Sequence, residues 1–440
     1  MRERHMNWWL ILVGLMVVLV ACGPATDESV TTADEPPPAT ATAPQASPTA
    51  EPTEPAPTET VPVQDTETET DVDDSAPDDA STDDGRSELF QQITADWNTN
   101  WELHSVSYDE IQPVLPRDAI RSLDEPTFET PEEAADWLGD EDPVIAFELN
   151  GQARAYPLRI LTAHEIVNDQ FGDVPVVITY CPLCNSAIVF DARVDGQTLE
   201  FGTTGMLRNS DLVMYDRTTE SLWQQFTGQA IVGDLTGEQL TFLPSSIVSF
   251  ADFRSAFPDG QVLSRDTGFR FDYAARAYAG YDDLDNIPTL FSGDVDPRLP
   301  AMERVVSVLI DEVAMAYPLS VVAEEGVIHD TVAGQALVVF YTSGTRSNFF
   351  NPVSNEWDDV GATAVFEPEL NGQSLTFVKE GKQIVDEQTG TVWNILGQGV
   401  DGPLAGETLT EIIHGNDFWF SWAAFYPDTN IYDPKTDSES

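Results

Sequence analysis

Basic residues and cysteines are scarce in this sequence. The 440 residues include 20 Lys and Arg against 76 Asp and Glu, which gives a formal net charge of −56 at pH 7. So large a negative charge opposes binding to nucleic acid and to anionic membrane surfaces, and we expect neither as a partner. Only three cysteines are present. Each of them therefore needs its own explanation.

Residues 23–85 contain no Lys, no Arg and no aromatic side chain, and are mostly Pro, Thr, Ala, Ser, Glu and Asp. A segment of this composition cannot bury enough apolar surface to offset the entropy that it would lose on ordering. Its like charges also repel one another and extend the chain. We therefore predict a disordered acidic linker, rich in Pro and Thr, over residues 23–86.

The first 22 residues resemble a bacterial lipoprotein signal peptide. Arg2 and Arg4 precede an apolar run from Trp8 to Val20, which is shorter than the roughly 20 residues of a membrane-spanning helix. The run ends in Leu19-Val20-Ala21-Cys22, which is similar to a lipobox, where the cysteine is diacylated. Two acyl chains anchor a protein stably. We expect lipid on Cys22, and a location on the cell membrane or outer envelope, facing away from the cytoplasm.

The rest of the chain contains an internal repeat. Residues 143–266 correspond to residues 304–431, in an order that is kept throughout with modest insertions. The clearest paired segments are Ala155-Tyr156-Pro157-Leu158 with Ala316-Tyr317-Pro318-Leu319, Val176–Tyr180 with Leu337–Tyr341, Asp195-Gly196-Gln197 with Asn371-Gly372-Gln373, and Phe257-Pro258-Asp259 with Tyr426-Pro427-Asp428. We infer a tandem duplication, and we call these two ranges the first and the second copy.

The pattern within each copy is typical of a mainly β (α+β) fold. Val176–Tyr180 is an apolar strand, and the turn pairs Asp195-Gly196 and Asn371-Gly372 predict hairpins. A short helix closes each copy, at Ser249–Phe257 and Asn416–Tyr426, and proline stops both helices. We therefore expect two small barrel-like or sandwich-like β units with short helices, behind the acidic stalk.

Three other segments complete the expected organisation. An N-terminal extension covers residues 87–142 and contains one helix, at Pro131–Leu138, with Thr130 as its N-cap. An insert rich in Arg, Asp and Tyr connects the copies over residues 267–303; it either closes over a pocket or is a packed linker. Residues 432–440 form a tail.

The two copies differ sharply at one place. After the strand that ends at Tyr180, the first copy reads Cys181-Pro182-Leu183-Cys184, whereas the aligned stretch of the second copy reads Thr342-Ser343-Gly344-Thr345. The fold does not need the cysteines, because the second copy lacks them. We infer that a property specific to the first copy requires Cys181 and Cys184.

Three interpretations of the Cys-x-x-Cys pair stay open. A structural disulfide would close so short a loop that it removes little entropy from the unfolded chain. A redox couple draws on the low thiol pKa that such motifs support, but a strand rather than a helix is predicted for Asn185–Asp191. In a metal site, the two thiolates would need two further ligands to complete a tetrahedral zinc centre.

Further candidate ligands lie in the first copy. His164 is the natural one, since Glu325 replaces it in the second copy, and Met206 or Met214 would suit copper. Asn209, Asp211 and Arg217 also lack counterparts and are candidate pocket residues. Two residues of the same region recur and are interpreted as an Asx-turn with a core tryptophan, namely Asp216 with Asp386 and Trp223 with Trp393.

From about Pro113 to the C-terminus the sequence resembles the DUF3179 family, an uncharacterised group of bacterial and archaeal proteins that are often exported. Position 185 is usually Gly in that family and is Asn185 here, and the stretch Phe269–Tyr273 is also altered. The resemblance implies no activity. It rests on His164-Glu165-Ile166-Val167-Asn168-Asp169, Thr179-Tyr180-Cys181-Pro182-Leu183-Cys184, Asn209–Arg217, Ser221-Leu222-Trp223, Arg298-Leu299-Pro300 and Glu303-Arg304-Val305.

Two hypotheses of function follow. The first is a lipid-anchored protein that binds copper or zinc, or carries out thiol redox chemistry, through Cys181, Cys184 and His164. The second is a non-catalytic binding or scaffold module in which Cys181 and Cys184 form a structural disulfide. The sequence offers no nucleophile elbow and no pair of carboxylates that would indicate a hydrolase, and it identifies no substrate or protein partner.

Overall fold

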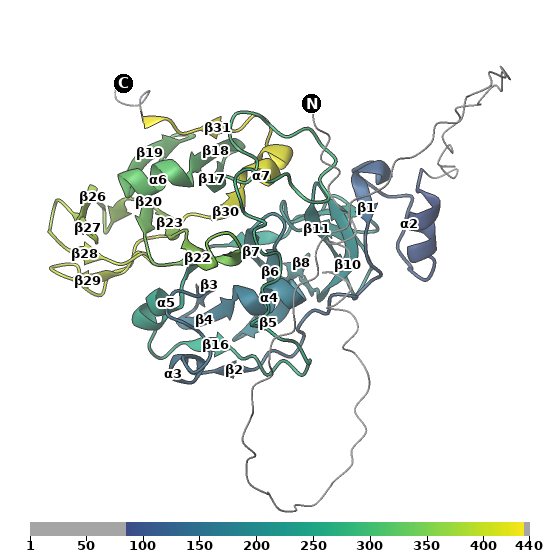
Figure 1. Cartoon of the computed structure of the whole chain (residues 1–440), viewed down its shortest axis with the longest axis horizontal. Coiled ribbons are helices and arrows are strands. Elements are labelled where there is room, and N and C mark those ends of the chain that lie inside the picture. The colour runs from purple at the N-terminus through teal and green to yellow at the C-terminus, as the bar shows by residue number, and fades with distance from the viewer. Residues whose placement is uncertain (1–84, 435–440) are drawn as a thin grey trace, which may run out of the picture. The chain divides into compact units, whose positions relative to one another are not determined.

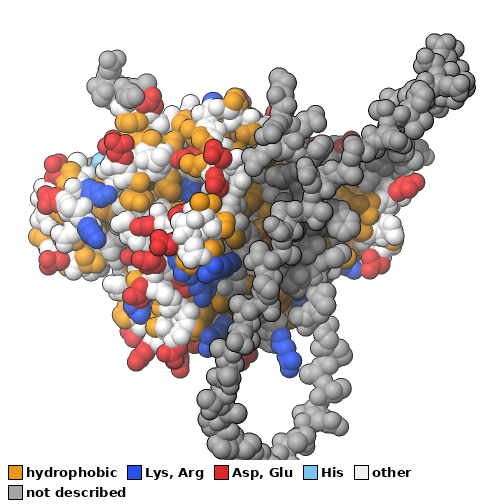
Figure 2. All heavy atoms as spheres, viewed as in Figure 1, with side chains coloured by type: hydrophobic (Ala, Val, Ile, Leu, Met, Phe, Trp, Pro, Cys, Tyr) orange, Lys and Arg blue, Asp and Glu red, His pale blue; other side chains and the backbone are white. Residues whose placement is uncertain are grey.

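A computed structural model describes residues 85–434, which form many short strands and a few short helices (Figure 1). The mainly β fold class predicted from the sequence is confirmed. The signal peptide with Cys22, nearly all of the acidic linker and the last residues of the tail lie outside this range. Within it, no helix has the length and apolar character needed to cross a membrane. Acidic side chains are spread over the visible face (Figure 2).

The first pair of equivalent sheets contains the strand hairpin that opens each copy. Its strands are antiparallel, except that β16 runs parallel to β4 and β31 parallel to β18. The first copy has the order β15-β3-β4-β16-β2 and the second β30-β17-β18-β31. The bounds are β2 Phe128–Glu129, β3 Pro143–Leu149, β4 Gln152–Pro157, β15 Ser246–Ser249, β16 Gln261–Leu263, β17 Arg304–Ile310, β18 Val313–Pro318, β30 His414–Phe418 and β31 Asn430–Ile431.

Each opening hairpin leads through a short helix into a second sheet. This sheet has the order β14-β7-β6-β5 in the first copy and β19-β20-β23 in the second. The apolar runs predicted as buried strands form its centre. The bounds are α4 Leu158–His164, β5 Ile166–Phe171, β6 Val174–Cys181, β7 Ser186–Asp191, β14 Thr241–Leu243, α6 Leu319–Glu325, β19 Val327–Val332, β20 Gln335–Thr342 and β23 Ala362–Phe366.

A third sheet follows in each copy, with the order β1-β10-β11-β12-β13 in the first and β26-β27-β28-β29 in the second. Small hairpins precede these sheets and one helix closes each copy. The bounds are β1 Ile111–Pro113, β8 Arg193–Val194, β9 Gln197–Thr198, β10 Phe201–Arg208, β11 Asp211–Asp216, β12 Leu222–Gln224, β13 Gln229–Val232, α5 Phe250–Ala256, β24 Glu369–Leu370, β25 Gln373–Ser374, β26 Phe377–Glu380, β27 Gln383–Asp386, β28 Val392–Trp393, β29 Gly399–Asp401 and α7 Trp419–Phe425.

Local turn chemistry agrees with the predictions. Asp195 and Gly196 adopt φ of 50° and 80°, and Asn371 and Gly372 adopt φ of 53° and 78°, as a two-residue hairpin with positive φ at both positions requires. The small hairpins β8–β9 and β24–β25 form at these turns.

The recurring Asp and Trp residues form the predicted structural motif. In the first copy the Asp216 carboxylate accepts hydrogen bonds from Thr219 N at 2.6 Å and from the Trp223 indole at 3.0 Å. In the second copy Asp386 accepts the same two bonds, from Thr389 N at 2.6 Å and Trp393 at 3.0 Å. The motif therefore belongs to the fold and not to a site.

The two copies share their hydrophobic cores. One core cluster combines Val144, Val248 and Phe250 of the first copy with Val338 and Phe340 of the second. The contacts are reciprocal: β7 packs against β30, and β23, which occupies the same place in the second copy, packs against β15. Because the contacts are shared in this way, the copies form one packed body.

Two helix boundaries were predicted wrongly. The helix expected at Pro131–Leu138 is α3, Pro131–Ala134, because the chain tightens after it into turns in which Trp137 N donates to Ala134 O. The helix expected at Asn416–Tyr426 begins at Trp419, because residues 414–418 pair with β17 as a strand.

The N-terminal extension contains more structure than the one predicted helix. A second helix, α2, covers Glu88–Ile93, and a 3-10 turn, η1, covers Tyr108–Glu110. Strands β1 and β2 join sheets of the first copy by pairing with β10 and β16. The extension is therefore an integral part of the first copy, because it supplies edge strands that its sheets would otherwise lack.

Candidate metal centre

The cysteines lie in a tight turn between two paired strands. Cys181 ends β6 and pairs with Ser186, the first residue of β7. Between them, Cys184 N donates to Cys181 O at 3.3 Å. Asn185 completes the turn with φ of 54°. Glycine adopts such a φ most easily, and asparagine tolerates it better than most other residues. Asn185 can therefore replace the usual Gly without disrupting the turn.

The second copy does not build this turn, although the sequences align across it. Thr342, the counterpart of Cys181, pairs with Ala362 and not with a residue a few positions later. The chain between them forms an additional hairpin, β21 Arg346–Asn351 with β22 Glu356–Asp359. The correspondence of Thr345 with Cys184 therefore holds in the sequence alignment but not in the structure.

This additional hairpin packs over the cysteine turn of the first copy. Phe349 belongs to the same buried cluster as Cys181 and Cys184. The Asn348 side-chain amide donates to the Thr162 hydroxyl at 2.8 Å and lies 3.4 Å from the Tyr180 hydroxyl. The second copy thus covers the site that the first copy carries.

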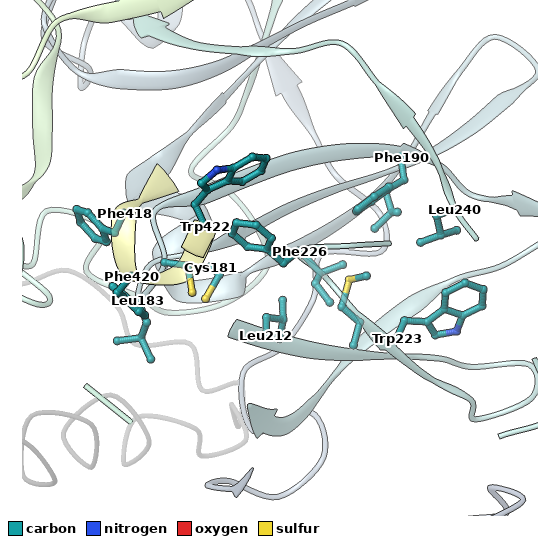
Figure 3. Close-up of a cluster of buried hydrophobic side chains, with 14 of the residues drawn as sticks. Cys181, Leu183, Phe190, Leu212, Trp223, Phe226, Leu240, Phe418, Phe420 and Trp422 are labelled. Carbon is teal, nitrogen blue, oxygen red and sulfur yellow. The ribbon is translucent and has the colours of Figure 1, made fainter. Parts of the chain in front are cut away.

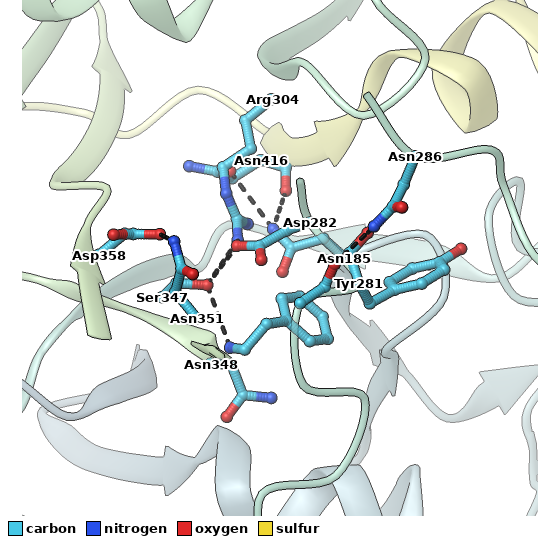
Figure 4. Close-up of polar contacts among 12 residues, drawn as sticks. Asn185, Tyr281, Asp282, Asn286, Arg304, Ser347, Asn348, Asn351, Asp358 and Asn416 are labelled. Atoms are coloured by element: carbon cyan, nitrogen blue, oxygen red, sulfur yellow. Dashed lines mark hydrogen bonds and ion pairs between the residues drawn. The ribbon is translucent and has the colours of Figure 1, made fainter. Parts of the chain in front are cut away.

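The connecting insert covers the turn from another side. The Tyr281 hydroxyl donates to Leu183 O at 3.0 Å, and the Ser210 hydroxyl donates to Thr289 O. Asp282 of the insert contacts the guanidinium of Arg304, the first residue of β17, at 3.0 Å (Figure 4). The insert is thus packed against the cysteine turn, as in the packed-linker alternative.

Three side chains with ligand atoms meet beneath this cover. One ligand atom each from Cys181, Cys184 and Asp211 lies within 4.8 Å of the other two, and all three residues are buried. Both cysteines belong to one buried cluster with Leu212, Phe226 and other apolar side chains, and Figure 3 shows Cys181 among them. No other group of three such residues meets this distance criterion within residues 85–434.

Asp211 is placed by the turn between β10 and β11. Asn209 and Ser210 occupy that turn with φ of 54° and 67°. The Oδ2 atom of Asp211 accepts hydrogen bonds from the Gln224 amide at 2.6 Å and from Phe226 N at 2.9 Å. Its Oδ1 atom is buried and has no hydrogen-bond partner in the described part of the chain. Native proteins rarely leave such an atom unsatisfied.

Burial dominates the electrostatics of the cluster. It raises the pKa of Asp211 to about 7, although hydrogen bonds and the nearby Cys181 thiol act in the opposite direction. Burial also raises the pKa of both thiols, that of Cys184 well above its usual value. All three groups therefore hold protons more tightly than in water, so a cation in their midst would have to displace those protons.

Two further carboxyl groups influence the cluster, and the sequence reasoning missed both. Burial raises the pKa of Glu165 to about 8, and the charge of Asp211 adds to this shift. Burial raises the pKa of Asp417, in β30, to about 7. Comparison of the copies could have found them, because Gly326 and Val248 stand at the equivalent positions.

The His164 ring is not part of this cluster. Its Nδ1 lies 2.6 Å from Arg121 O, and its Nε2 lies 2.7 Å from the Tyr273 hydroxyl. With both ring nitrogens engaged, the ring is held as a buried structural group, and burial lowers its pKa.

The other candidates from the sequence are dispersed. Met214 belongs to the apolar cluster around the cysteines, whereas Met206 packs in a different cluster with Phe90. Asn209 shapes the turn before Asp211, as described above. Arg217 forms an ion pair with Asp124 at 3.0 Å. Of the predicted pocket residues, only Asp211 is thus brought to the cysteines.

Comparison with known proteins supports the resemblance noted in the sequence. The family model described as "Protein of unknown function (DUF3179)" matches residues 117–429. Searches of curated proteins and of solved structures find no match to the chain. The matched range covers the first copy, the insert and all but the last two residues of the second copy. The chain therefore belongs to the DUF3179 family.

Proposed function

We propose that this protein holds a transition-metal ion, zinc in preference to copper, between Cys181, Cys184 and Asp211. Two observations carry the proposal: the Asp211 Oδ1 atom is buried and without a hydrogen-bond partner in the described part of the chain, and a carboxylate oxygen of Asp211 lies within 4.8 Å of both thiols. A metal ion would satisfy this atom and compensate the proximity of three acidic groups.

The donor set favours zinc. Thiolates suit both zinc and copper(I), but a carboxylate oxygen is a hard ligand that zinc accepts more readily than copper(I) does. Among residues 85–434, no histidine belongs to the group whose ligand atoms lie close together. Binding would release the protons of these groups, so the affinity should rise with pH.

Thiol redox chemistry is less consistent with the site. A reactive cysteine needs a thiolate that is accessible to its partner. Here both thiols are buried and their pKa values are raised. The turn also leads into strand β7 instead of a helix N-terminus that would stabilise a thiolate.

The proposed place of action is outside the cytoplasm. The resemblance of residues 1–22 to a lipoprotein signal peptide supports an anchor at Cys22, and the acidic residues 23–85 would separate this anchor from the folded part. The lipid anchor and the metal centre involve different residues, so one of these two proposals can fail while the other holds.

The test is elemental analysis of protein purified under anaerobic conditions, without affinity steps that use metal. We expect about one zinc per chain, retained through dialysis, and its loss in Cys181→Ser, Cys184→Ser and Asp211→Asn. His164→Ala is the matched control, because it removes a buried candidate ligand outside the cluster and should keep the metal. Wild-type protein that takes up neither zinc nor copper, with a disulfide between its cysteines, would overturn the proposal in favour of a structural clip.

A further inference from the structure

Glu165 has an unusual backbone conformation for its residue type. It caps the C-terminus of α4 with φ of 59° and ψ of −33°. In the second copy Gly326 caps α6 with φ of 74° and ψ of −29°. Positive φ at a helix C-cap is the usual place for glycine and is unfavourable for a residue with a Cβ atom.

The two caps are equivalent by hydrogen bonding as well as by sequence. Glu165 N donates to Leu161 O, and Gly326 N donates to Val322 O in the same way. The Glu165 carbonyl accepts a bond from Tyr180 N at 2.8 Å, and the Gly326 carbonyl accepts one from Tyr341 N at 3.0 Å. Glycine is therefore sufficient for the fold at this position, and the presence of a glutamate in the first copy is not explained by the helix cap.

The Glu165 side chain adds a second cost to this backbone. Glu165 is only 9% exposed, and its carboxylate has no hydrogen bond or ion pair among residues 85–434. A buried carboxyl without partners destabilises the folded state. Its carbonyl accepts the hydrogen bond from Tyr180 N, and Tyr180 directly precedes Cys181, so Glu165 lies beside the candidate metal centre.

We propose that Glu165 is the fourth protein ligand of the metal centre. This inference rests on the function proposed above. Cys181, Cys184 and Asp211 leave one position of a tetrahedral site open. The Glu165 carboxylate is not among the atoms that lie within 4.8 Å of one another, so its side chain has to turn toward them, and no hydrogen bond holds it back. Four protein ligands close the site, so the ion is a resident one and does not activate water for hydrolysis.

Cobalt(II) titration of the Glu165→Gly variant tests this assignment. The substitution imitates Gly326 and relieves the backbone, so the metal-free variant should melt about 2 °C higher than the wild type. Its affinity for cobalt should fall at least tenfold. The thiolate-to-cobalt charge-transfer band should remain, because both cysteines stay, whereas the d–d bands should change as water replaces the carboxylate. Added acetate should restore part of the affinity.

Two variants serve as controls. Ala333→Gly relieves a positive φ of 50° at an exposed turn of the second copy, and should change thermal stability without changing cobalt affinity. Glu165→Gln keeps the side-chain volume and should weaken cobalt binding as Glu165→Gly does. If Glu165→Gly binds cobalt with wild-type affinity and spectrum, Glu165 is not a ligand although the metal centre stands. If the wild type itself binds no cobalt, both proposals fail.

Discussion

Asp417 provides a test of the electrostatics around the cysteines that requires no bound metal. Its buried carboxylate accepts a hydrogen bond of 2.5 Å from the Ser307 hydroxyl, and burial raises its pKa to about 7. Asp417 pairs with Val305 across the sheet, and Val248 pairs with Val144 at the equivalent place in the first copy. The fold thus accepts an apolar residue here.

The direction of the pH dependence follows from the raised pKa. The folded protein binds this proton more tightly than the unfolded chain, whose aspartates titrate near 3.8. The free energy of unfolding should therefore fall as the pH rises from about 4 to about 7 and remain low above that. This difference in pKa between the folded and the unfolded state corresponds to about 4 kcal/mol for this single group.

The perturbation is Asp417→Asn, which removes the titration and keeps an acceptor for Ser307. Urea unfolding in the presence of a chelator should give similar free energies for variant and wild type at pH 4, and a variant more stable by about 4 kcal/mol at pH 8. Asp259→Asn, at an exposed aspartate, is the control. Equal pH dependence of Asp417→Asn and wild type would refute the reasoning.

Two further predictions concern the duplicated fold and the anchor. Asp216→Ala and Asp386→Ala should each lower the free energy of unfolding, measured by chemical denaturation, by about 4 kcal/mol, because each leaves several buried donors without an acceptor. If only one of the two variants were destabilised, the shared structural role of the motif would be contradicted. Cys22→Ser should release the protein from membranes or block its processing; correct cleavage with full membrane retention in a fractionation experiment would refute the lipid anchor.

Local chemistry made part of this fold predictable. The hairpin turns at Asp195-Gly196 and Asn371-Gly372 depend on two adjacent residues that tolerate positive φ, and both formed as expected. The Asx motif at Asp216 depends on donors within seven residues. Interactions of this range can be read from the sequence because the partners are close along the chain.

Long-range pairing was not predictable in the same way. The sequence after Thr342 aligns with the cysteine turn, yet the chain leaves the sheet for a hairpin and returns at Ala362. Nothing in the local residues distinguishes a direct turn from such an excursion, because both begin with turn-forming residues. The partners of His164 show the same limit, since Arg121 and Tyr273 lie far from it in the sequence.

The differences between the copies have one property in common. At Glu165, Asp417 and the cysteine turn, one copy carries an acidic or thiol group where the other carries glycine, valine or an unrelated hairpin. Each of these groups is buried, and burial is the main cause of their raised pKa values; nearby acidic groups add to the rise at Glu165 and Cys184. Arg304 approaches the same region but is already paired with Asp282. A buried carboxyl group without a partner disfavours folding. A bound cation would attract the buried acidic and thiol groups together, which is why we favour a metal over a passive disulfide.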